Sequence, residues 1–304
     1  MNLTEQYLTE SSGLLCIYHG NCADGFGAAW AVRHALGEDF TEFYPGVYQT
    51  PPPDAGGRDV LLVDFSYKAE ALLELATTAR TVTVLDHHKS AREGLAPFVD
   101  VLGVQEPLIE FLGRCDRAKR PPIRALFDMD RSGAMIAWDA FLPGQEPPTL
   151  LKHIQDRDLW RFDLDGTSAI QAALFSYPYD FELWDTLMAM GTDTLRKEGE
   201  IIERKHFKDI VELVEQMQRP MEIGGYLVPV ANLPYTMASD AGHIMAKGRP
   251  FSACYFDKPD CRYFSLRSGE GGVDVSDIAK QYGGGGHRDS AGFTVPRDHD
   301  LAKA

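Results

Sequence analysis

The sequence has few cysteines and no long apolar run. Five cysteines occur among its 304 residues, none of them in a CxxC pair: Cys16, Cys22, Cys115, Cys254 and Cys261. An odd, unpaired set argues against a secreted disulfide scaffold and is typical of a reducing compartment. No apolar stretch approaches the length of a membrane span, and the polar residues 1–12 lack the order of a signal peptide. We therefore expect a cytoplasmic protein that does not bind membranes.

Basic residues are also scarce, because 30 lysines and arginines face 45 aspartates and glutamates, a formal net charge of -15. A field of this sign repels long duplex nucleic acid, since the phosphates are themselves negative. Small or short anionic substrates are not excluded, because metal ions can reverse the potential inside a site. The charge therefore disfavours a processive nuclease and is neutral about a nucleotide hydrolase.

One dense basic region stands out in this acidic chain, and it comprises Arg114, Arg117, Lys119, Arg120, Arg124 and Arg131. We interpret this region as a solvated face. The alternative is a rim that guides nucleotides toward a site by its charge.

The first half of the chain alternates strand-like and helix-like segments. Apolar runs at 14–18, 59–64 and 81–85 indicate buried strands, whereas residues 25–36 and 69–79 indicate helices. Apolar strands separated by helices predict a parallel sheet covered on both faces, so the expected fold class is α/β.

The second half begins with an amphipathic pattern. Apolar residues recur at helical spacing from Thr192 to Met217, which predicts one long helix that Arg219-Pro220 ends. Residues 226–230 and 263–266 then indicate strands of a smaller α+β unit. We therefore expect domains at 1–190 and 221–304, joined by the helical segment 191–220, with the binding site in the cleft between them.

Polar side chains follow each of the three predicted strands of the first domain. His19 ends the first strand, Asp64 ends the second, and Asp86-His87-His88 follows the third. Ligands bind at the carboxyl ends of parallel strands, and neighbouring strands lie ~5 Å apart. Carboxylates and imidazoles that converge there are suitable ligands for the divalent ions that activate water for phosphoryl transfer.

Each of these residues also has a simpler interpretation. A strand-end aspartate such as Asp64 is commonly a turn or helix cap, and Asp24-Gly25 could cap the helix that follows. A His-His pair is more often structural than ligating. The combination of three such strand ends in one sheet favours a metal site. Asp156 and Asp158 flank an arginine and alone would indicate a solvated helix end, but beside an incomplete metal site one of them is a further candidate ligand.

Near the C-terminus, four consecutive glycines precede His287. Such a loop is flexible and rich in backbone donors, so it can approach an anion closely. The loop could instead serve only as a hinge, and His287 could be an ordinary turn residue. Arg267, which follows the apolar run 263–266, is either an edge-strand residue or a substrate ligand, and we favour the second interpretation.

Together these motifs resemble the DHH phosphoesterase superfamily over nearly the whole chain. The four ordered motifs of its catalytic domain match His19 with Asp24-Gly25, then Asp64, then Asp86-His87-His88, then the Asp156/Asp158 segment. Its DHHA1 companion domain is matched by residues 265–268, 274–279, 283–287 and 291–292. Residues 127–134 are similar to the NrnB-like subgroup, which is associated with oligoribonuclease and cyclic-nucleotide phosphodiesterase activity. The implied architecture is a helix-covered parallel-sheet DHH domain joined by a long helix to a DHHA1 domain.

The resemblance implies which residues bind metal. His19 would bind a first ion, Asp24 and His87 a second, and Asp64 would bridge both and hold the water or hydroxide nucleophile. The implied cofactor is Mn²⁺, as one or two ions, with Mg²⁺ or Co²⁺ as substitutes. Asp156 or Asp158 would complete the second ion, and the resemblance does not decide between them.

The resemblance also implies which residues act on the substrate. His88 would contact the scissile phosphate, and Asp86 would orient a neighbouring imidazole. Arg267, His287 and three loop residues would hold a terminal phosphate or nucleotide; the three are Gly284, Gly285 and Gly286.

One position departs from the superfamily pattern. The first motif usually has two aspartates two residues apart, but here Cys22 stands two residues before Asp24. Because Mn²⁺ prefers oxygen ligands to a thiolate, we expect a weakened first site. It could use Asn21 instead or fill only with substrate, and Cys22 could be a small thiol without a role.

The leading hypothesis is a Mn²⁺-dependent phosphodiesterase that hydrolyses short oligonucleotides or small, including cyclic, nucleotides. A second hypothesis is a phosphomonoesterase or polyphosphatase, such as one acting on 3′-phosphoadenosine 5′-phosphate. A third is a nucleotide sensor that has lost catalysis through Cys22. The oligomeric state stays open, a homodimer included.

Overall fold

The computed structural model describes residues 3–10, 12–48, 50–99, 106–115 and 121–303. The chain divides into two compact units, Met1–Ile201 and Ile202–Ala304. The long helix α10 (Thr192–Met217) runs across this division and has the bounds that the amphipathic pattern predicts. Within the described ranges, the search for a helix long and apolar enough to cross a membrane finds none.

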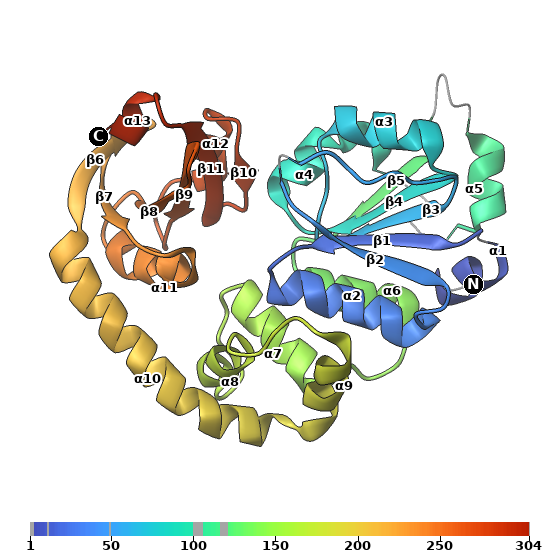
Figure 1. Ribbon diagram of the computed structural model, residues 1–304, viewed down its shortest axis with the longest axis horizontal. Helices are drawn as coiled ribbons and strands as arrows, with labels where there is room; N and C mark the ends of the chain where they lie inside the picture. The colour runs from blue at the N-terminus through green and yellow to red at the C-terminus, as the bar shows by residue number, and fades with distance from the viewer. Residues whose placement is uncertain (1–2, 11, 49, 100–105, 116–120, 304) are drawn as a thin grey trace. The chain divides into compact units, whose positions relative to one another are not determined.

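The first unit is built on a sheet of five parallel strands in the order β2-β1-β3-β4-β5 (Figure 1). In chain order the strands are β1 (Leu14–His19), β2 (Thr41–Gly46), β3 (Asp59–Val63), β4 (Thr81–Asp86) and β5 (Ile123–Phe127). The predicted α/β class is therefore confirmed. The apolar runs missed β2, a half-exposed edge strand with Pro45, and β5, whose second residue is Arg124.

Helices cover both faces of this sheet. The helices of this unit are α1 (Leu3–Glu10), α2 (Ala23–Leu36), α3 (Ala69–Thr78), α4 (Lys89–Gly94), α5 (Leu108–Arg114), α6 (Gly133–Phe141), α7 (Thr149–Asp158), α8 (Thr167–Leu174) and α9 (Phe181–Met190). Of these, α7 packs on α2 and α6, and α8 and α9 pack on α7. Figure 1 shows α2 and α6 on one face and α3 on the other. Alternate strand residues face two separate cores, so that Leu14 and Cys16 join one while Leu15 and Ile17 join the other. Burial on both faces explains why the strands are continuously apolar.

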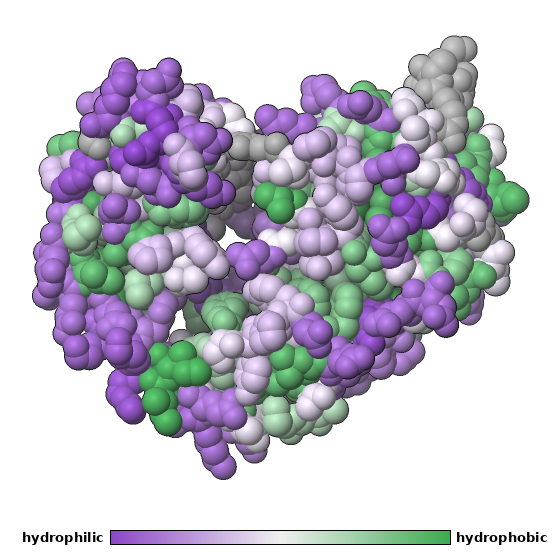
Figure 2. All heavy atoms as spheres, in the orientation of Figure 1, coloured by the Kyte–Doolittle hydropathy of each residue, from purple (hydrophilic) through white to green (hydrophobic). Residues whose placement is uncertain are grey.

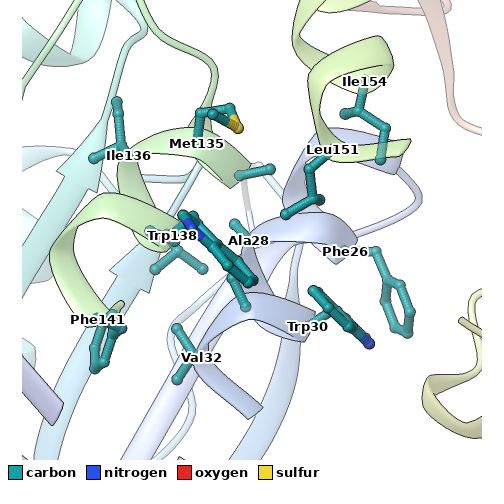
Figure 3. Close-up of a cluster of buried hydrophobic side chains, with 14 of the residues drawn as sticks. Phe26, Ala28, Trp30, Val32, Met135, Ile136, Trp138, Phe141, Leu151 and Ile154 are labelled. Carbon is teal, nitrogen blue, oxygen red and sulfur yellow. The ribbon is translucent and has the colours of Figure 1, made fainter. Parts of the chain in front are cut away.

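The larger core fixes the helices that border the site. In Figure 3, Trp30 of α2 lies near side chains of α6 and α7, including Trp138 and Leu151. The rings of Trp30 and Trp138 stack at a centroid distance of 6.1 Å. Gly27 allows a close approach, because a Cβ there would lie 3.2 Å from Ala134 Cβ. This packing sets where the first turns of α2 and α6 lie.

The basic region is not a uniform solvated face. Arg124 is fully buried, and its guanidinium donates to Thr83 Oγ1 at 3.1 Å and to the carbonyl of Glu106 at 2.8 Å. Its partners are therefore inside the unit, and neither the solvated-face nor the rim interpretation holds for this residue. Arg114 pairs with Glu106, and Arg131 pairs with Asp139. The remaining members, Arg117, Lys119 and Arg120, lie outside the described residues.

The second unit contains a six-stranded mixed sheet in the order β10-β11-β9-β8-β7-β6, as the predicted α+β unit requires. Its strands are β6 (Arg219–Ile223), β7 (Tyr226–Asn232), β8 (Ser252–Asp257), β9 (Cys261–Arg267), β10 (Gly285–Gly286) and β11 (Ser290–Pro296). Its helices are α11 (Tyr235–Ala246), α12 (Val275–Lys280) and α13 (Asp300–Lys303). Among the described strands of this unit, β7 and β8 pair in parallel and the other neighbouring pairs are antiparallel. Hydrophilic side chains make up much of the surface of each unit in the view of Figure 2.

Candidate metal centre

The carboxyl ends of β1, β3 and β4 bring the predicted polar residues together. These strands are neighbours in the sheet, with Val63 of β3 level with Tyr18 of β1 and with Leu85 of β4. The chain leaves each strand at the same edge, so His19, Asp64 and the Asp86–His88 triplet emerge side by side. Adjacency in the parallel sheet thus accounts for the cluster.

Three carboxylates surround one nitrogen of His87. Its Nε2 lies 3.0 Å from Asp64 Oδ1, 3.5 Å from Asp158 Oδ2 and 3.6 Å from Asp24 Oδ2. Asp24 and Asp64 are buried, while the side chain of Asp158 keeps 26% exposure. Asp24, His87 and Asp158 each offer a ligand atom within 4.8 Å of the others. Buried carboxylates at this spacing require a compensating positive charge, which a divalent cation supplies.

The other oxygen of Asp64 faces a second group. His19, Cys22 and Asp64 each offer a ligand atom within 4.8 Å of the others. His19 Nδ1 and Asp64 Oδ2 are 3.4 Å apart, and both are buried without a hydrogen-bond partner among the described residues. Orphaned buried polar atoms are costly unless a ligand satisfies them. Since Asp64 presents one oxygen to each group, the donor set fits a pair of cations that share this carboxylate.

Asp64 adopts an unusual backbone conformation. Its φ is +53°, in the left-handed region that aspartate and asparagine tolerate better than most residues. Its N–H donates to the carbonyl of Leu85 at 3.0 Å, which holds the turn in place. Non-glycine residues in this region commonly mark functional sites, because surrounding structure must maintain the strain. Together with its position between the two groups, the strain marks Asp64 as the centre of the cluster.

Gly133, at the first position of α6, is a site residue that the sequence motifs did not identify individually. A Cβ at Gly133 would lie 2.3 Å from Asp64 Cβ, closer than real side chains approach. The N–H groups of Gly133 and Ala134 donate to the two Asp24 oxygens at 2.5 and 3.0 Å. The amino end of α6 therefore holds Asp24 in place and contributes positive dipole charge beside it.

The buried charged groups of the cluster shift one another's pKa values. Burial raises the pKa of Asp24 well above its ordinary value, and the charges of Asp64 and Asp158 act in the same direction. Burial alone would also raise the pKa of Asp64, but the neighbouring imidazoles of His19 and His87 hold this pKa well below the usual range. Both imidazoles in turn have a pKa well above the ordinary value, although burial opposes this shift. A bound cation would offset the same buried carboxylates that raise the pKa of these imidazoles.

Asp86 holds the following two residues. Its Oδ1 accepts hydrogen bonds from the backbone N–H groups of His87 and His88, at 2.7 and 3.2 Å. The same oxygen lies 2.7 Å from Nδ1 of His88. A carboxylate at this distance favours the tautomer of His88 with its proton on Nδ1 and fixes the orientation of the ring.

Asp156 and Asp158, which the sequence left as alternatives, occupy different surroundings at the end of α7. Asp156 accepts hydrogen bonds from the N–H groups of Asp163 and Leu164 and from Thr167 Oγ1, at 2.9, 3.0 and 2.5 Å. These bonds hold its pKa below the ordinary value, although burial alone would raise it. Asp158 instead lies beside His87. Only Asp158 of the two belongs to a candidate metal group formed by the described residues.

We expect Asp156→Asn to lower stability and Asp158→Asn to weaken metal binding. Asp156→Asn turns an amide nitrogen toward backbone donors and should lower the free energy of unfolding by about 1–3 kcal/mol. Asp158→Asn should leave thermal unfolding of the metal-free protein nearly unchanged and weaken Mn²⁺ binding by about 10–100-fold. Thermal unfolding and Mn²⁺ titration measure the two effects. The reverse outcome, with Mn²⁺ affinity lost only in Asp156→Asn, would contradict the assignment.

Two aromatic residues border the histidines. The ring centroid of Tyr48 lies 5.2 Å from that of His19 and 6.4 Å from that of His88, and Phe65 lies 6.0 Å from His19. Tyr48 keeps 47% of its surface exposed. The sequence patterns missed Tyr48 because it follows β2, the edge strand that the apolar runs did not reveal.

In the second unit, Arg267 ends β9. Its Nη1 donates to Ser265 Oγ at 3.0 Å and to the carbonyl of Leu266 at 2.8 Å, and its Nε lies 3.4 Å from Ser239 Oγ. The stem packs on α11, since a Cβ at Gly242 would lie 2.6 Å from Arg267 Cγ. The guanidinium is therefore held by contacts within its own unit.

The glycine loop has a packing reason for its composition. The N–H groups of Gly283 and Gly284 donate to carbonyls at 280 and 279, and that of His287 donates to the carbonyl at 290. A Cβ at Gly284 would lie 2.1 Å from the carbonyl oxygen of Gly292, and one at Gly286 would lie 2.5 Å from that of Ser290. Gly285 and Gly286 form β10. The loop is thus less rich in available donors than its sequence indicates, because several of them close hydrogen bonds inside the unit.

The chain was compared with known protein families, curated sequences and solved structures. No protein-family model matches the chain. It is 30% identical to an uncharacterized protein, R106, of Acanthamoeba polyphaga mimivirus over 306 aligned positions, which cover 91% of this chain and 66% of that protein. The chain thus spans slightly less than two thirds of this relative.

Among solved structures, the chain is similar to RecJ from Thermus thermophilus, crystallised in complex with Mn²⁺. The TM-score is 0.50 at 12% identity, with 96% of this chain and 51% of RecJ covered. A match to PggH of Vibrio cholerae, a pGpG-specific phosphodiesterase, has a TM-score of 0.39 at 12% identity and covers 96% and 95% of the two chains. The parallel-sheet unit followed by a mixed-sheet unit is the DHH/DHHA1 fold that RecJ has.

Proposed function

We propose that this chain is a divalent-metal-dependent phosphoesterase of the DHH superfamily. The observation that carries the proposal is the Asp64 carboxylate, whose Oδ1 lies 3.0 Å from His87 Nε2 and whose Oδ2 lies 3.4 Å from His19 Nδ1. One buried carboxylate between two sets of ligand atoms suits a two-cation site for phosphoryl transfer. The shared fold with RecJ, whose crystals contain Mn²⁺, supports this reading.

The residues divide into two ligand sets. Asp24, His87 and Asp158 would hold one ion, and His19 and Cys22 would hold the other, with Asp64 shared. Divalent ions bound here would supply Lewis acidity toward a phosphoryl oxygen and would make a water molecule nucleophilic at neutral pH. The carboxylate of Asp64 would orient that water for attack.

His88 would act on the substrate rather than on the ions. The contact between His88 Nδ1 and Asp86 Oδ1 at 2.7 Å orients the ring, which fits a residue that contacts a non-bridging oxygen of the scissile phosphate. Hydrolysis forms a P–O bond to the oxygen of water and breaks the P–O bond to the leaving oxygen, which takes up a proton. Asp86 therefore acts through His88, as a positioning residue.

For the substrate, we propose short oligonucleotides or small nucleotides, cyclic ones included. A net charge of -15 repels long polyanions, which favours substrates with few phosphates. Arg267, His287 and the loop glycines Gly284, Gly285 and Gly286 are the proposed substrate contacts of the second unit. Tyr48, exposed beside His19 and His88, offers a ring face against which a base could stack. Mn²⁺ is the proposed ion, and Mg²⁺ or Co²⁺ are the proposed substitutes.

A panel of substrates tests this function. We expect Mn²⁺-dependent release of mononucleotides from di- to pentanucleotides, and a rate at least about tenfold lower on a long single strand at low salt. A chelator should abolish turnover, and added Mn²⁺ should restore it. Equal rates on a dinucleotide and on a long strand would contradict the length limit.

The same panel separates the alternatives. Turnover of 3′-phosphoadenosine 5′-phosphate or polyphosphate without cleavage of any phosphodiester would replace the phosphodiesterase with a phosphomonoesterase or polyphosphatase. Tight nucleotide binding without turnover of any substrate, in the presence of Mn²⁺, would favour the nucleotide sensor.

A further inference from the structure

Cys22 is the residue immediately before α2. It has the extended backbone of a helix N-cap, with φ -131° and ψ 134°, but its side chain makes no capping hydrogen bond. Serine, threonine, aspartate and asparagine are the usual residues at this position, because their oxygen atoms accept from the first helical N–H groups. The thiol is therefore not explained by the start of the helix.

The thiol instead lies beside two orphaned ligand atoms. Cys22, His19 and Asp64 offer one ligand atom each, all within 4.8 Å of one another. His19 Nδ1 and Asp64 Oδ2 are buried and have no hydrogen-bond partner among the described residues, and the Asp64 side chain is only 2% exposed. These two buried polar atoms lie 3.4 Å apart, and with the thiol beside them they form a set of one nitrogen, one sulfur and one oxygen.

The other four cysteines do not share these surroundings. Cys16 and Cys254 are buried in hydrophobic cores, where burial raises the pKa of the Cys254 thiol to about 12. Cys115, whose thiol donates to the carbonyl of Phe111 at 3.2 Å, and Cys261 belong to no candidate metal group found among the described residues. The chain thus places a single half-buried thiol at the candidate metal centre.

We propose that His19, Cys22 and Asp64 form a thiolate-containing site that selects Zn²⁺ over Mn²⁺, beside an oxygen-rich site that takes Mn²⁺. Thiolate and imidazole ligands suit Zn²⁺, whereas carboxylates suit Mn²⁺ and Mg²⁺. Metal binding releases the thiol proton to solvent as the sulfur–metal bond forms. Asp24, His87 and Asp158 contain no sulfur, so the two ligand sets differ in the ion they favour. The inference deepens the proposed function, on which it rests for the shared Asp64.

Cobalt serves as the spectroscopic probe for the thiolate. The full chain is stripped of metal with a chelator, the chelator is removed, and Co²⁺ is titrated in while the near-ultraviolet absorption is recorded. Wild type should develop a thiolate-to-cobalt charge-transfer band. Cys22→Ser and Cys22→Asp should lack this band, whereas the control Cys261→Ser should keep it. Circular dichroism confirms that each variant is folded, and the Asp variant guards against a failure of the Ser variant to fold.

Competition between Zn²⁺ and Mn²⁺ gives the second readout. With both ions at equal, limiting concentration, metal analysis after gel filtration should find Zn²⁺ bound to wild type. In Cys22→Asp, the preference for Zn²⁺ over Mn²⁺ should fall by at least about tenfold. A charge-transfer band that persists in both Cys22 variants, or a preference unchanged by Cys22→Asp, would overturn the proposal.

Neither readout depends on turnover, so the two proposals fail separately. A cobalt–thiolate band in a protein that hydrolyses no phosphoester would support the proposed zinc site and contradict the proposed phosphoesterase activity. Turnover with Mn²⁺ in a wild-type protein that shows no such band would contradict the proposed zinc site and support the proposed phosphoesterase activity.

Discussion

Asp64→Asn should lower the turnover of any phosphoester substrate by about a hundredfold to a thousandfold and leave the fold intact. The substitution removes the charge that the two proposed ligand sets share, so it weakens both ions and the orientation of the nucleophile at once. Asparagine is the informative replacement because Asp64 has a φ of +53°, which asparagine tolerates. Alanine would add backbone strain and confuse a chemical effect with a folding defect.

Steady-state kinetics in Mn²⁺, metal content per chain and thermal unfolding together test this expectation. Asp165→Asn is a matched control, because that carboxylate is highly exposed and pairs with Arg196 on the surface. The control should keep full activity. If Asp64→Asn retained more than a small fraction of wild-type turnover with normal unfolding, Asp64 could not bridge the proposed ions.

Gly133→Ala should damage both the site and the fold. The added Cβ would lie 2.3 Å from Asp64 Cβ, and the nearby atoms are the backbone and first side-chain carbons of Asp64, which cannot move aside freely. Either Asp64 or the first turn of α6 must shift, and α6 also donates the two N–H groups that hold Asp24. Overpacking of this kind lowers the free energy of unfolding by about 1–3 kcal/mol. We expect activity to fall at least about a hundredfold, because small displacements of reacting groups have effects of that size.

Gly94→Ala is the control for this substitution. Gly94 ends α4, the helix that begins directly after His88, and a Cβ there would meet no atom within 4 Å. This variant should be as active as wild type and equally or slightly more stable, since alanine favours a helix more than glycine does. Normal activity and unfolding in Gly133→Ala would show that the contact with Asp64 does not constrain the site.

The sequence alone was sufficient to predict the strands and helices that have a local hydrophobic pattern. The apolar runs that became β1, β3 and β4 are buried on both faces, and a strand buried in this way needs no information from distant residues to be recognised. The helix from Thr192 to Met217 was equally readable, because its apolar spacing repeats over many turns. The edge strand β2 and the arginine-containing β5 lack such a pattern, so their pairing only emerges from the folded sheet.

The sequence predicted which residues of the site lie at strand ends, but it did not predict what surrounds their side chains. Polar residues directly after apolar strands predicted that His19, Asp64 and His87 would meet, since parallel neighbours end at one edge of the sheet. Asp156 and Asp158 could not be separated in this way. Two positions on a helix differ in direction by about 200°, so the choice depends on which side of α7 faces the site.

Chain position and composition by themselves determined the fold class, and gave the two-unit organisation and the candidate metal ligands at the strand ends as hypotheses. The tertiary structure alone decided that Asp158 lies beside His87, that Arg124 is buried, and that Gly133 lies against Asp64. The physical reason is the separation along the chain of the residues that interact. Periodicity and strand ends are encoded by residues a few positions apart, whereas the contact of Gly133 with Asp64 joins segments that only the packing of α6 against the sheet brings together.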